Sequence, residues 1–141
     1  MNSKIIIATF LGAVVSFILG YLIWGVALTS FMTQNAGSAR GVMKTEMGGE
    51  NLLFIFLGNI AFAYLFTHIF YSWAKINTFE GGVRAGALIG LLMALGIELV
   101  SYGADNIINL NGTIVNIIAR TILGALTGGV IAAYLGNRKT A

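Results

Sequence analysis

Four stretches of the chain are apolar for long enough to cross a membrane, and polar segments separate them. About 20 residues of helix span the hydrocarbon core of a bilayer. A chain in lipid has to satisfy its backbone polar groups internally, so each stretch is expected to be helical. The predicted helices cover residues 5–32, 52–74, 83–104 and 113–136. The first stretch is too long for the apolar region of a signal peptide, and we interpret it as an uncleaved helix.

The composition places the chain outside the soluble classes. Of its 141 residues, 57% are hydrophobic and 9% are charged, whereas a soluble domain carries about 25% charged residues. The absence of cysteine excludes disulfides, iron–sulfur clusters and thiolate metal sites. The basic residues are too scattered to follow a nucleic-acid backbone. We therefore predict an all-α, polytopic membrane protein that has the lipid bilayer as a partner and binds no nucleic acid.

The distribution of lysine and arginine predicts the orientation of the helices. Four spans bring both termini to one side, and that side carries five lysine and arginine residues, against two on the other side. Because basic residues concentrate on the cytoplasmic side of a membrane, we expect both termini to lie in the cytoplasm of a bacterial inner membrane. The five are Lys4, Lys75, Arg84, Arg138 and Lys139, and the two are Arg40 and Lys44.

Small residues recur at every fourth position in the third and fourth predicted helices. Such spacing lets two backbones approach closely, which drives helix association in lipid. The two helices are consecutive and are joined by a short segment, so we expect an antiparallel, glycine-zipper hairpin in which Gly82 lies opposite Gly136. The small-residue ladder consists of Gly82, Gly86, Gly90 and Ala94 in the third helix and Gly124, Gly128, Ala132 and Gly136 in the fourth.

One charged residue continues each side of the small-residue ladder. Glu98 is the next position after Ala94, and Arg120 comes four residues before Gly124. A lone charge at mid-membrane costs about 2.5–3.5 kcal/mol on insertion scales. The same register that matches the small residues sets Glu98 opposite Arg120, and we predict that they pair. A structural ion pair that fixes the register is the favoured interpretation, and part of a ligand or ion pathway is the alternative.

Other polar residues are expected near this charged layer. Trp24 continues a small-residue stripe in the first helix, and Asn59 lies at a similar depth in the second. Tyr102 lies one turn beyond Glu98 and would cap the layer. The cluster is interpreted either as a satisfied polar network or as a shallow pocket. His68, the only histidine, is interpreted as an interfacial anchor beside aromatic residues, with a proton relay or haem ligand as the alternative; no metal site is apparent.

Four segments carry a resemblance that covers nearly the whole chain. The chain resembles a group of small bacterial four-helix membrane proteins of unknown function, which implies a four-helix fold and carries over no catalytic residue. The segments are FILGYLIWG (17–25), LFIFLGNIAFAYLF (53–66), FEGGVRAGALIGLLMALGIELVSYG (79–103) and ILGALTGGVIAAYLG (122–136).

These observations lead to an all-α membrane protein with four transmembrane helices, arranged as two antiparallel hairpins. We expect a non-enzymatic structural or accessory membrane component without a cofactor. The alternative is a small oligomeric transporter or channel in which Glu98 responds to protons or cations, and a membrane enzyme that acts on lipid or quinone is the third hypothesis. Because 141 residues enclose little volume, a homo-oligomer or a partner in a membrane complex is expected for any transport pathway.

Overall fold

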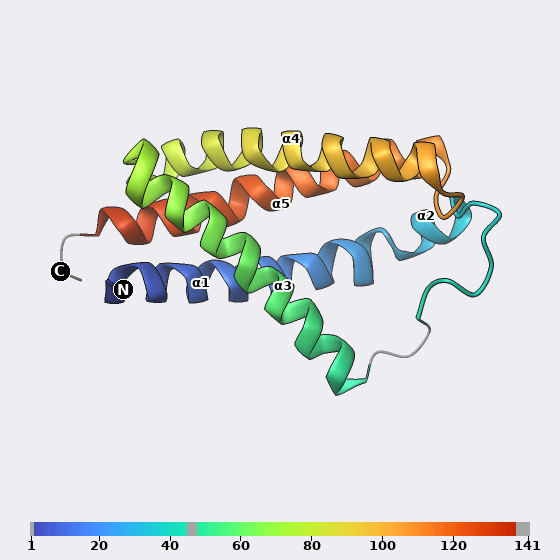
Figure 1. Ribbon diagram of the computed structural model, residues 1–141, viewed down its shortest axis with the longest axis horizontal. Coiled ribbons are helices and arrows are strands. Elements are labelled where there is room, and N and C mark those ends of the chain that lie inside the picture. Colours follow the sequence, from blue (N-terminus) through green and yellow to red (C-terminus); the bar gives the residue numbers. More distant parts are fainter. Residues whose placement is uncertain (1, 45–47, 138–141) are drawn as a thin grey trace.

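The apolar stretches form four long helices in the computed structural model, which describes residues 2–44 and 48–137 (Figure 1). Each of the four is apolar and long enough to cross a membrane, so the protein is an all-α protein of the polytopic membrane class. Two of the helices end in π-helical segments. The elements are α1 (Ser3–Gly20), η1 (Tyr21–Ala27), α2 (Thr29–Gln34), α3 (Gly49–His68), η2 (Ile69–Ala74), α4 (Phe79–Ala104) and α5 (Leu110–Gly136).

The start of α1 and the end of α5 lie at the same end of the molecule, which we call the terminal end (Figure 1). The Nζ of Lys4 donates a hydrogen bond to the carbonyl of Asn137 across this end, at 3.2 Å. Arg138 and Lys139 lie outside the described residues. The opposite end, called the loop end, carries α2 and the α4–α5 connection. The loop that follows α2 is fixed there by an isolated bridge between Ala36 and Ile108.

The most extensive helix packing joins α4 to α5, and the small-residue ladder forms this interface. A Cβ atom on Gly82 would overlap the Gly128 carbonyl and the Ala132 methyl group, and one on Gly86 would overlap the Gly124 carbonyl. Such close approach requires residues without side chains at the contact, because added atoms would force the backbones apart.

The register of this interface differs from the predicted one. Gly82 lies between Gly128 and Ala132, whereas the sequence pairs it with Gly136. Gly136 instead packs against the backbone of Asn77, which precedes α4. The shift is about six residues, or roughly 9 Å along the axis. In this register the small residues of each helix fit between those of the other, so each glycine accommodates backbone from two neighbouring positions.

The helix α1 packs against both α3 and α5, and the buried apolar residues gather where the three meet. Gly12 of α1 lies at the centre, because a Cβ there would come within 2.5 Å of Ile131 of α5 and 3.1 Å of Ala63 of α3. Ala8 is also fully buried in this core, whereas Gly20 has open space around it. The small-residue stripe of the first helix, which consists of Ala8, Gly12, Ser16 and Gly20, is therefore buried as far as Ser16 and open at Gly20.

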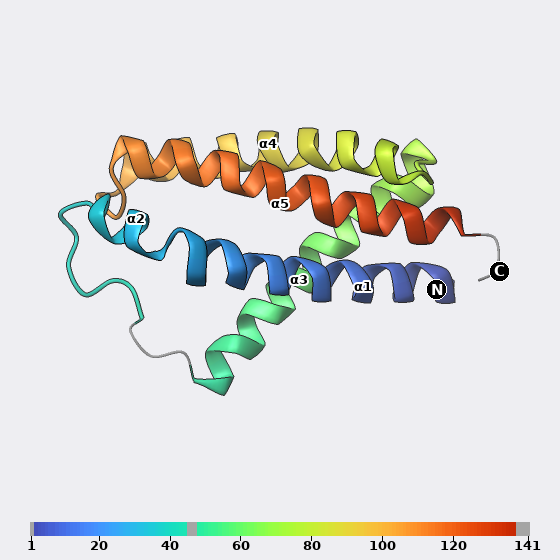
Figure 2. The same cartoon turned by 180° about the vertical axis from the view of Figure 1, so that it is seen from behind.

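The helix α3 crosses the other long helices obliquely, and its first half diverges from them (Figures 1 and 2). Several of its large apolar side chains there are exposed, with Phe54 at 64% and Leu53 at 54%, whereas Phe56 packs against Phe10 and Phe17 of α1. The second half joins the core through Phe66 and Phe70. In a membrane such side chains face lipid, which leaves α3 anchored near the terminal end and separated from α4 toward the loop end.

Several helix bounds differ from the predicted ones: α3 begins at Gly49 rather than at residue 52, and α4 begins at Phe79 rather than at residue 83. The first helix is not continuous over 5–32, because it changes to the π-helical segment η1 at Tyr21 and restarts as α2 at Thr29. The fourth begins at Leu110 rather than at residue 113, because Asn109 caps it: the Asn109 side chain accepts a hydrogen bond from the Gly112 backbone at 3.0 Å. Side-chain caps of this kind satisfy backbone N–H groups that have no partner within the helix.

Candidate functional site

Glu98 of α4 and Arg120 of α5 are in direct contact. The Nε of Arg120 donates a hydrogen bond to Oε1 of Glu98 at 2.8 Å. The Glu98 residue is 7% exposed, whereas the Arg120 side chain is 38% exposed. The carboxylate is thus enclosed by protein, and part of the guanidinium group faces out of the helix pair.

The ion pair forms although the helix register is shifted, because of the directions in which helical side chains lean. The backbone of Arg120 lies level with Gly90, two ladder positions nearer the terminal end than Glu98. A helical side chain leans toward the N-terminus of its own helix. In this antiparallel pair Glu98 therefore leans toward the terminal end and Arg120 toward the loop end, so the two long side chains meet between their backbone positions.

Trp24 joins this ion pair from the first helix. Its ring lies 5.6 Å from Cζ of Arg120, and its Nε1 donates a hydrogen bond to Oδ1 of Asn116 at 2.6 Å. Trp24 belongs to the π-helical segment η1. Such segments are rare and often occur at functional sites. The site therefore unites three elements: η1, α4 and α5.

Asn116 is a site residue that the sequence analysis missed. It is 6% exposed, and its side-chain oxygen accepts the Trp24 hydrogen bond. The available signal was its spacing, because Asn116 lies four residues before Arg120 and thus continues the small-residue ladder of α5 toward the loop end. A buried amide whose hydrogen bond is satisfied fixes the position of the tryptophan ring.

A groove lies between α3 on one side and α4 and α5 on the other, and we call it the lateral groove. It is open to the surroundings, and the space within and in front of it amounts to about 540 Å³. Arg120 lines it, and so does Asn59, whose Nδ2 donates to the Ile55 carbonyl at 2.8 Å. Asn59 thus shares the groove with Arg120 and makes no hydrogen bond to the ion pair. The remaining lining residues are Ser16, Phe62, Phe66, Gly90, Met93, Ala94, Ile97, Leu123, Gly124 and Thr127.

A second, more polar cavity lies at the loop end of α4, and we call it the loop-end cavity. It is partly open, with about 390 Å³ of space that includes its mouth, and it is lined by Glu98, Tyr102 and Asp105, together with Ser101, Ile107, Ile108 and Thr113. Tyr102 therefore shares a cavity with Glu98 while remaining 44% exposed. Because Arg120 lines the lateral groove and Glu98 lines the loop-end cavity, the ion pair lies between the two cavities.

His68 has no part in this arrangement. Its ring packs against the rings of Tyr64 at 5.8 Å and Trp73 at 5.2 Å, near the end of α3. These contacts place it in an aromatic cluster toward the terminal end. Within the described part of the chain, no group of three histidine, aspartate or glutamate side chains is placed to hold a metal ion.

Three buried threonine hydroxyls have no hydrogen-bond partner within residues 2–44 and 48–137, namely those of Thr9, Thr67 and Thr127. Threonine in a helix commonly bonds back to a carbonyl in the preceding turn, as Thr121 does to Ile117 at 2.8 Å. Thr127 differs from the other two because it lines the lateral groove. An unsatisfied buried hydroxyl is a place where a ligand or water forms a compensating hydrogen bond.

Comparison of the chain with protein-family models, with curated proteins and with solved structures finds no match.

Proposed function

We propose that this chain is a non-enzymatic structural or accessory component of a bacterial inner membrane, with both termini in the cytoplasm. The observation that supports this role is the linked arrangement of Asn116, Trp24, Arg120 and Glu98, which ties the first helix to the α4–α5 hairpin. Each of the four side chains contacts another of the four, as expected of a network that fixes helix packing.

A small oligomeric transporter or channel is the second candidate, and one observation favours it. The Glu98–Arg120 ion pair lies between the loop-end cavity and the lateral groove. If the pair opened, the two cavities would join, and Glu98 would be exposed to protons or cations from the loop end. Polar and ionisable residues inside a membrane are commonly functional, and a homo-oligomer would supply the volume that one chain lacks.

Flux measurements in proteoliposomes distinguish the two candidates. Purified protein is reconstituted with a pH-sensitive dye inside, and a pH gradient or a K⁺ gradient is imposed. An accessory component gives the flux of empty liposomes for the native chain and for Glu98→Gln alike. Flux through the native chain that Glu98→Gln abolishes would contradict our proposal and establish transport. Glu80→Gln is the matched control, because Glu80 is 74% exposed at the terminal end and pairs with Arg84.

A further inference from the structure

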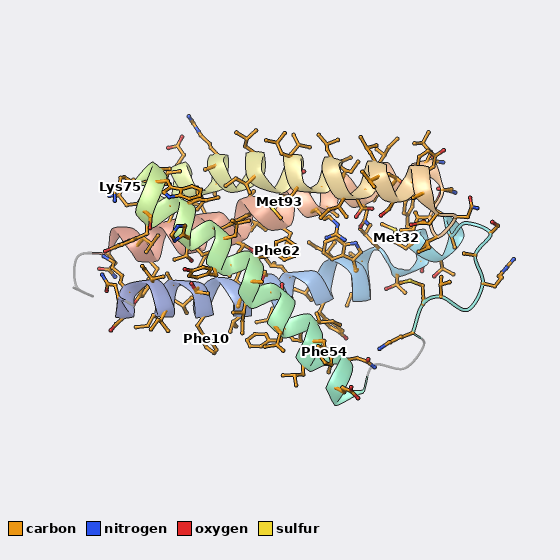
Figure 3. The ribbon with its side chains drawn as sticks, viewed as in Figure 1. Phe10, Met32, Phe54, Phe62, Lys75 and Met93 are labelled. Atoms are coloured by element: carbon orange, nitrogen blue, oxygen red, sulfur yellow. The ribbon has the colours of Figure 1, made fainter. Side chains whose placement is uncertain are left out.

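We propose that the lateral groove binds a neutral amphiphile whose headgroup carries carbonyl oxygens on opposite sides of a ring, which is the chemistry of an isoprenoid quinone. This inference goes beyond the accessory role and requires no ion flux. The sequence alone predicts no cofactor, and no residue pattern in it marks a groove. The fold, however, brings apolar and hydrogen-bonding side chains of α3, α4 and α5 together in the lateral groove, and these side chains suggest a ligand (Figure 3).

The walls of the lateral groove suit such a ligand. The groove is open, and its space of about 540 Å³ includes the part that faces the surroundings. Phe62 and Phe66 of α3 and Met93 of α4 contribute to its walls, and Figure 3 labels Phe62 and Met93 on neighbouring stretches of the two helices. Flat aromatic rings and the polarisable thioether of methionine pack well against a planar ring.

The groove lies along the face from which α3 diverges, in the part of the molecule built from membrane-spanning helices (Figures 1 and 2). Phe62 and Ile97 line it and are still 43% and 46% exposed. A ligand that reaches them arrives laterally through the bilayer. A long isoprenoid tail satisfies this requirement, because it partitions into lipid and extends out of the groove among the acyl chains.

The charges of the site favour a neutral headgroup. Glu98 already balances the charge of Arg120, and it does so through Nε. Within the described residues Nη1 and Nη2 of Arg120 make no hydrogen bond, and they belong to a side chain that is 38% exposed. An anionic headgroup would have to compete with Glu98 for the same guanidinium group, whereas a carbonyl oxygen accepts from the remaining N–H groups and leaves the ion pair intact.

A second polar group faces the same groove from the opposite helix. Asn59 of α3 uses one N–H of its amide for the Ile55 carbonyl, so its other N–H and its Oδ1 remain to bind a ligand. Arg120 on α5 and Asn59 on α3 thus present hydrogen-bonding groups from two walls. The two carbonyls of a quinone point in opposite directions, and this arrangement matches them. In the reduced form, a ligand hydroxyl donates to Oδ1 of Asn59.

Tryptophan fluorescence tests the proposal directly. The chain has two tryptophans, and Trp73→Phe leaves Trp24, which lies against Arg120, as the only one. This variant is placed in phosphatidylcholine nanodiscs and titrated with decylubiquinone, because quinones quench indole fluorescence at short range and Trp24 lies against Arg120, which lines the groove. We expect saturable quenching of Trp24. Quenching that rises without saturation as quinone fills the bilayer would overturn the proposal.

Paired variants separate binding in the groove from general effects on the protein. Met93→Phe fills the groove, whereas Leu92→Phe adds the same ring at a neighbouring position that is 59% exposed and does not line the groove. We expect the dissociation constant to rise at least tenfold in Met93→Phe and to stay within twofold in Leu92→Phe. Asn59→Leu is expected to weaken binding about tenfold at unchanged thermal stability. Equal affinities across these variants would overturn the proposal.

Two alternative occupants of the groove, an anionic phospholipid and a second copy of the chain, can be distinguished from a quinone by separate measurements. Displacement of the quinone by brominated phosphatidylglycerol, with saturable quenching of Trp24 by this lipid, would identify an anionic-phospholipid site instead. The chain lacks cysteine, so Phe62→Cys introduces the only thiol. Disulfide-linked dimers of Phe62→Cys that form in the native membrane and exclude quinone would show that a second copy covers the groove. Either result would contradict quinone binding.

Discussion

At the scale of residues, the ion pair is asymmetric, and this asymmetry determines what each substitution costs. Glu98 is enclosed and Arg120 is partly exposed. Removing one partner of a buried pair leaves an uncompensated charge, which costs more than the pair itself contributes. Trp24 compensates part of the Arg120 charge through its ring, and Glu98 has no comparable second partner among the described side chains. Loss of Arg120 therefore costs more than loss of Glu98, because it leaves the enclosed Glu98 carboxylate without a partner.

We predict that Arg120→Gln lowers the free energy of unfolding by about 3–5 kcal/mol and that Glu98→Gln lowers it by about 2.5–3.5 kcal/mol. The double variant is expected to lose less than the sum of the two, because no charge remains unpaired. Denaturation of the purified protein in mixed micelles measures all three. Additive losses would contradict coupling between the two residues.

The two single variants and the double variant form a double-mutant cycle, and the exposed pair Glu80–Arg84 serves as its control. Its side chains are 74% and 79% exposed and lie one helical turn apart in α4. Exposed pairs at this spacing contribute about 0.3–0.5 kcal/mol. The coupling free energy measured with Glu80→Gln and Arg84→Gln is therefore expected to be smaller than the coupling free energy between Glu98 and Arg120.

At the scale of elements, the α4–α5 interface depends on individual glycines rather than on the number of small residues. Gly86 lies against the backbone of Gly124 and Gly128, whereas Gly96, in the same helix, has open space where a Cβ would lie. The two positions are therefore expected to respond differently to the same substitution.

We predict that Gly86→Ala destabilises the hairpin by about 1–3 kcal/mol, because its methyl group overlaps backbone that cannot move independently. Gly96→Ala is expected to be neutral or stabilising by up to about 1 kcal/mol, because alanine favours helix. Unfolding midpoints in detergent compare the two. A larger loss for Gly96→Ala would indicate that its face is covered in the membrane.

The sequence predicts the existence and packing faces of these elements but not their offset. Spacing by four identifies the face of α4 that carries Gly82 and Glu98, since the face of a helix follows from its period. It does not fix the axial position, because Gly82 fits equally well opposite one small residue or between two. The π-helical segment η1 is hidden for a related reason: YLIWGVA is apolar throughout, and no polar position marks where the helical period changes.

In the polar site, too, one part can be predicted from the sequence and another part cannot. Glu98 and Arg120 stand out because charge is rare in an apolar run. Their long side chains meet even though the observed offset of α4 and α5 differs from the predicted one by about 9 Å. The lateral groove has no such signal. It depends on the crossing direction of α3, which arises from packing between residues such as Gly12 and Ile131 that are distant in sequence.

At the scale of the whole molecule, the two ends differ in charge and in how they are closed. The terminal end carries Lys4, Lys75 and Arg84, whereas the loop end is held by backbone bonds between its two loops. Gly37 donates to the Ile107 carbonyl at 2.8 Å, and Asn109 donates to the Asn35 carbonyl at 2.9 Å. A Cβ on Gly37 would overlap the Asn106 carbonyl, so glycine is required where the loops meet.

We predict that the loop end faces away from the cytoplasm. Because the chain has no cysteine, Ser38→Cys and Asn77→Cys each supply a single thiol at an exposed position. A membrane-impermeant maleimide applied to intact spheroplasts is expected to label Ser38→Cys at once and Asn77→Cys only after permeabilisation. The reverse pattern would invert the proposed orientation.

The hydrogen bond between Trp24 and Asn116 also has a consequence for biosynthesis. Its partners are 92 residues apart, and a nascent chain is delivered N-terminus first. While the first helix enters the bilayer, the Trp24 indole has no partner from α5, and α4 then arrives with the carboxylate of Glu98 uncompensated until α5 follows. The short connection between α4 and α5 limits that interval, which favours insertion of the two as one hairpin. Because α5 is translated after Trp24 and Glu98, a chain truncated before α5 would lack the partners of both, Asn116 and Arg120.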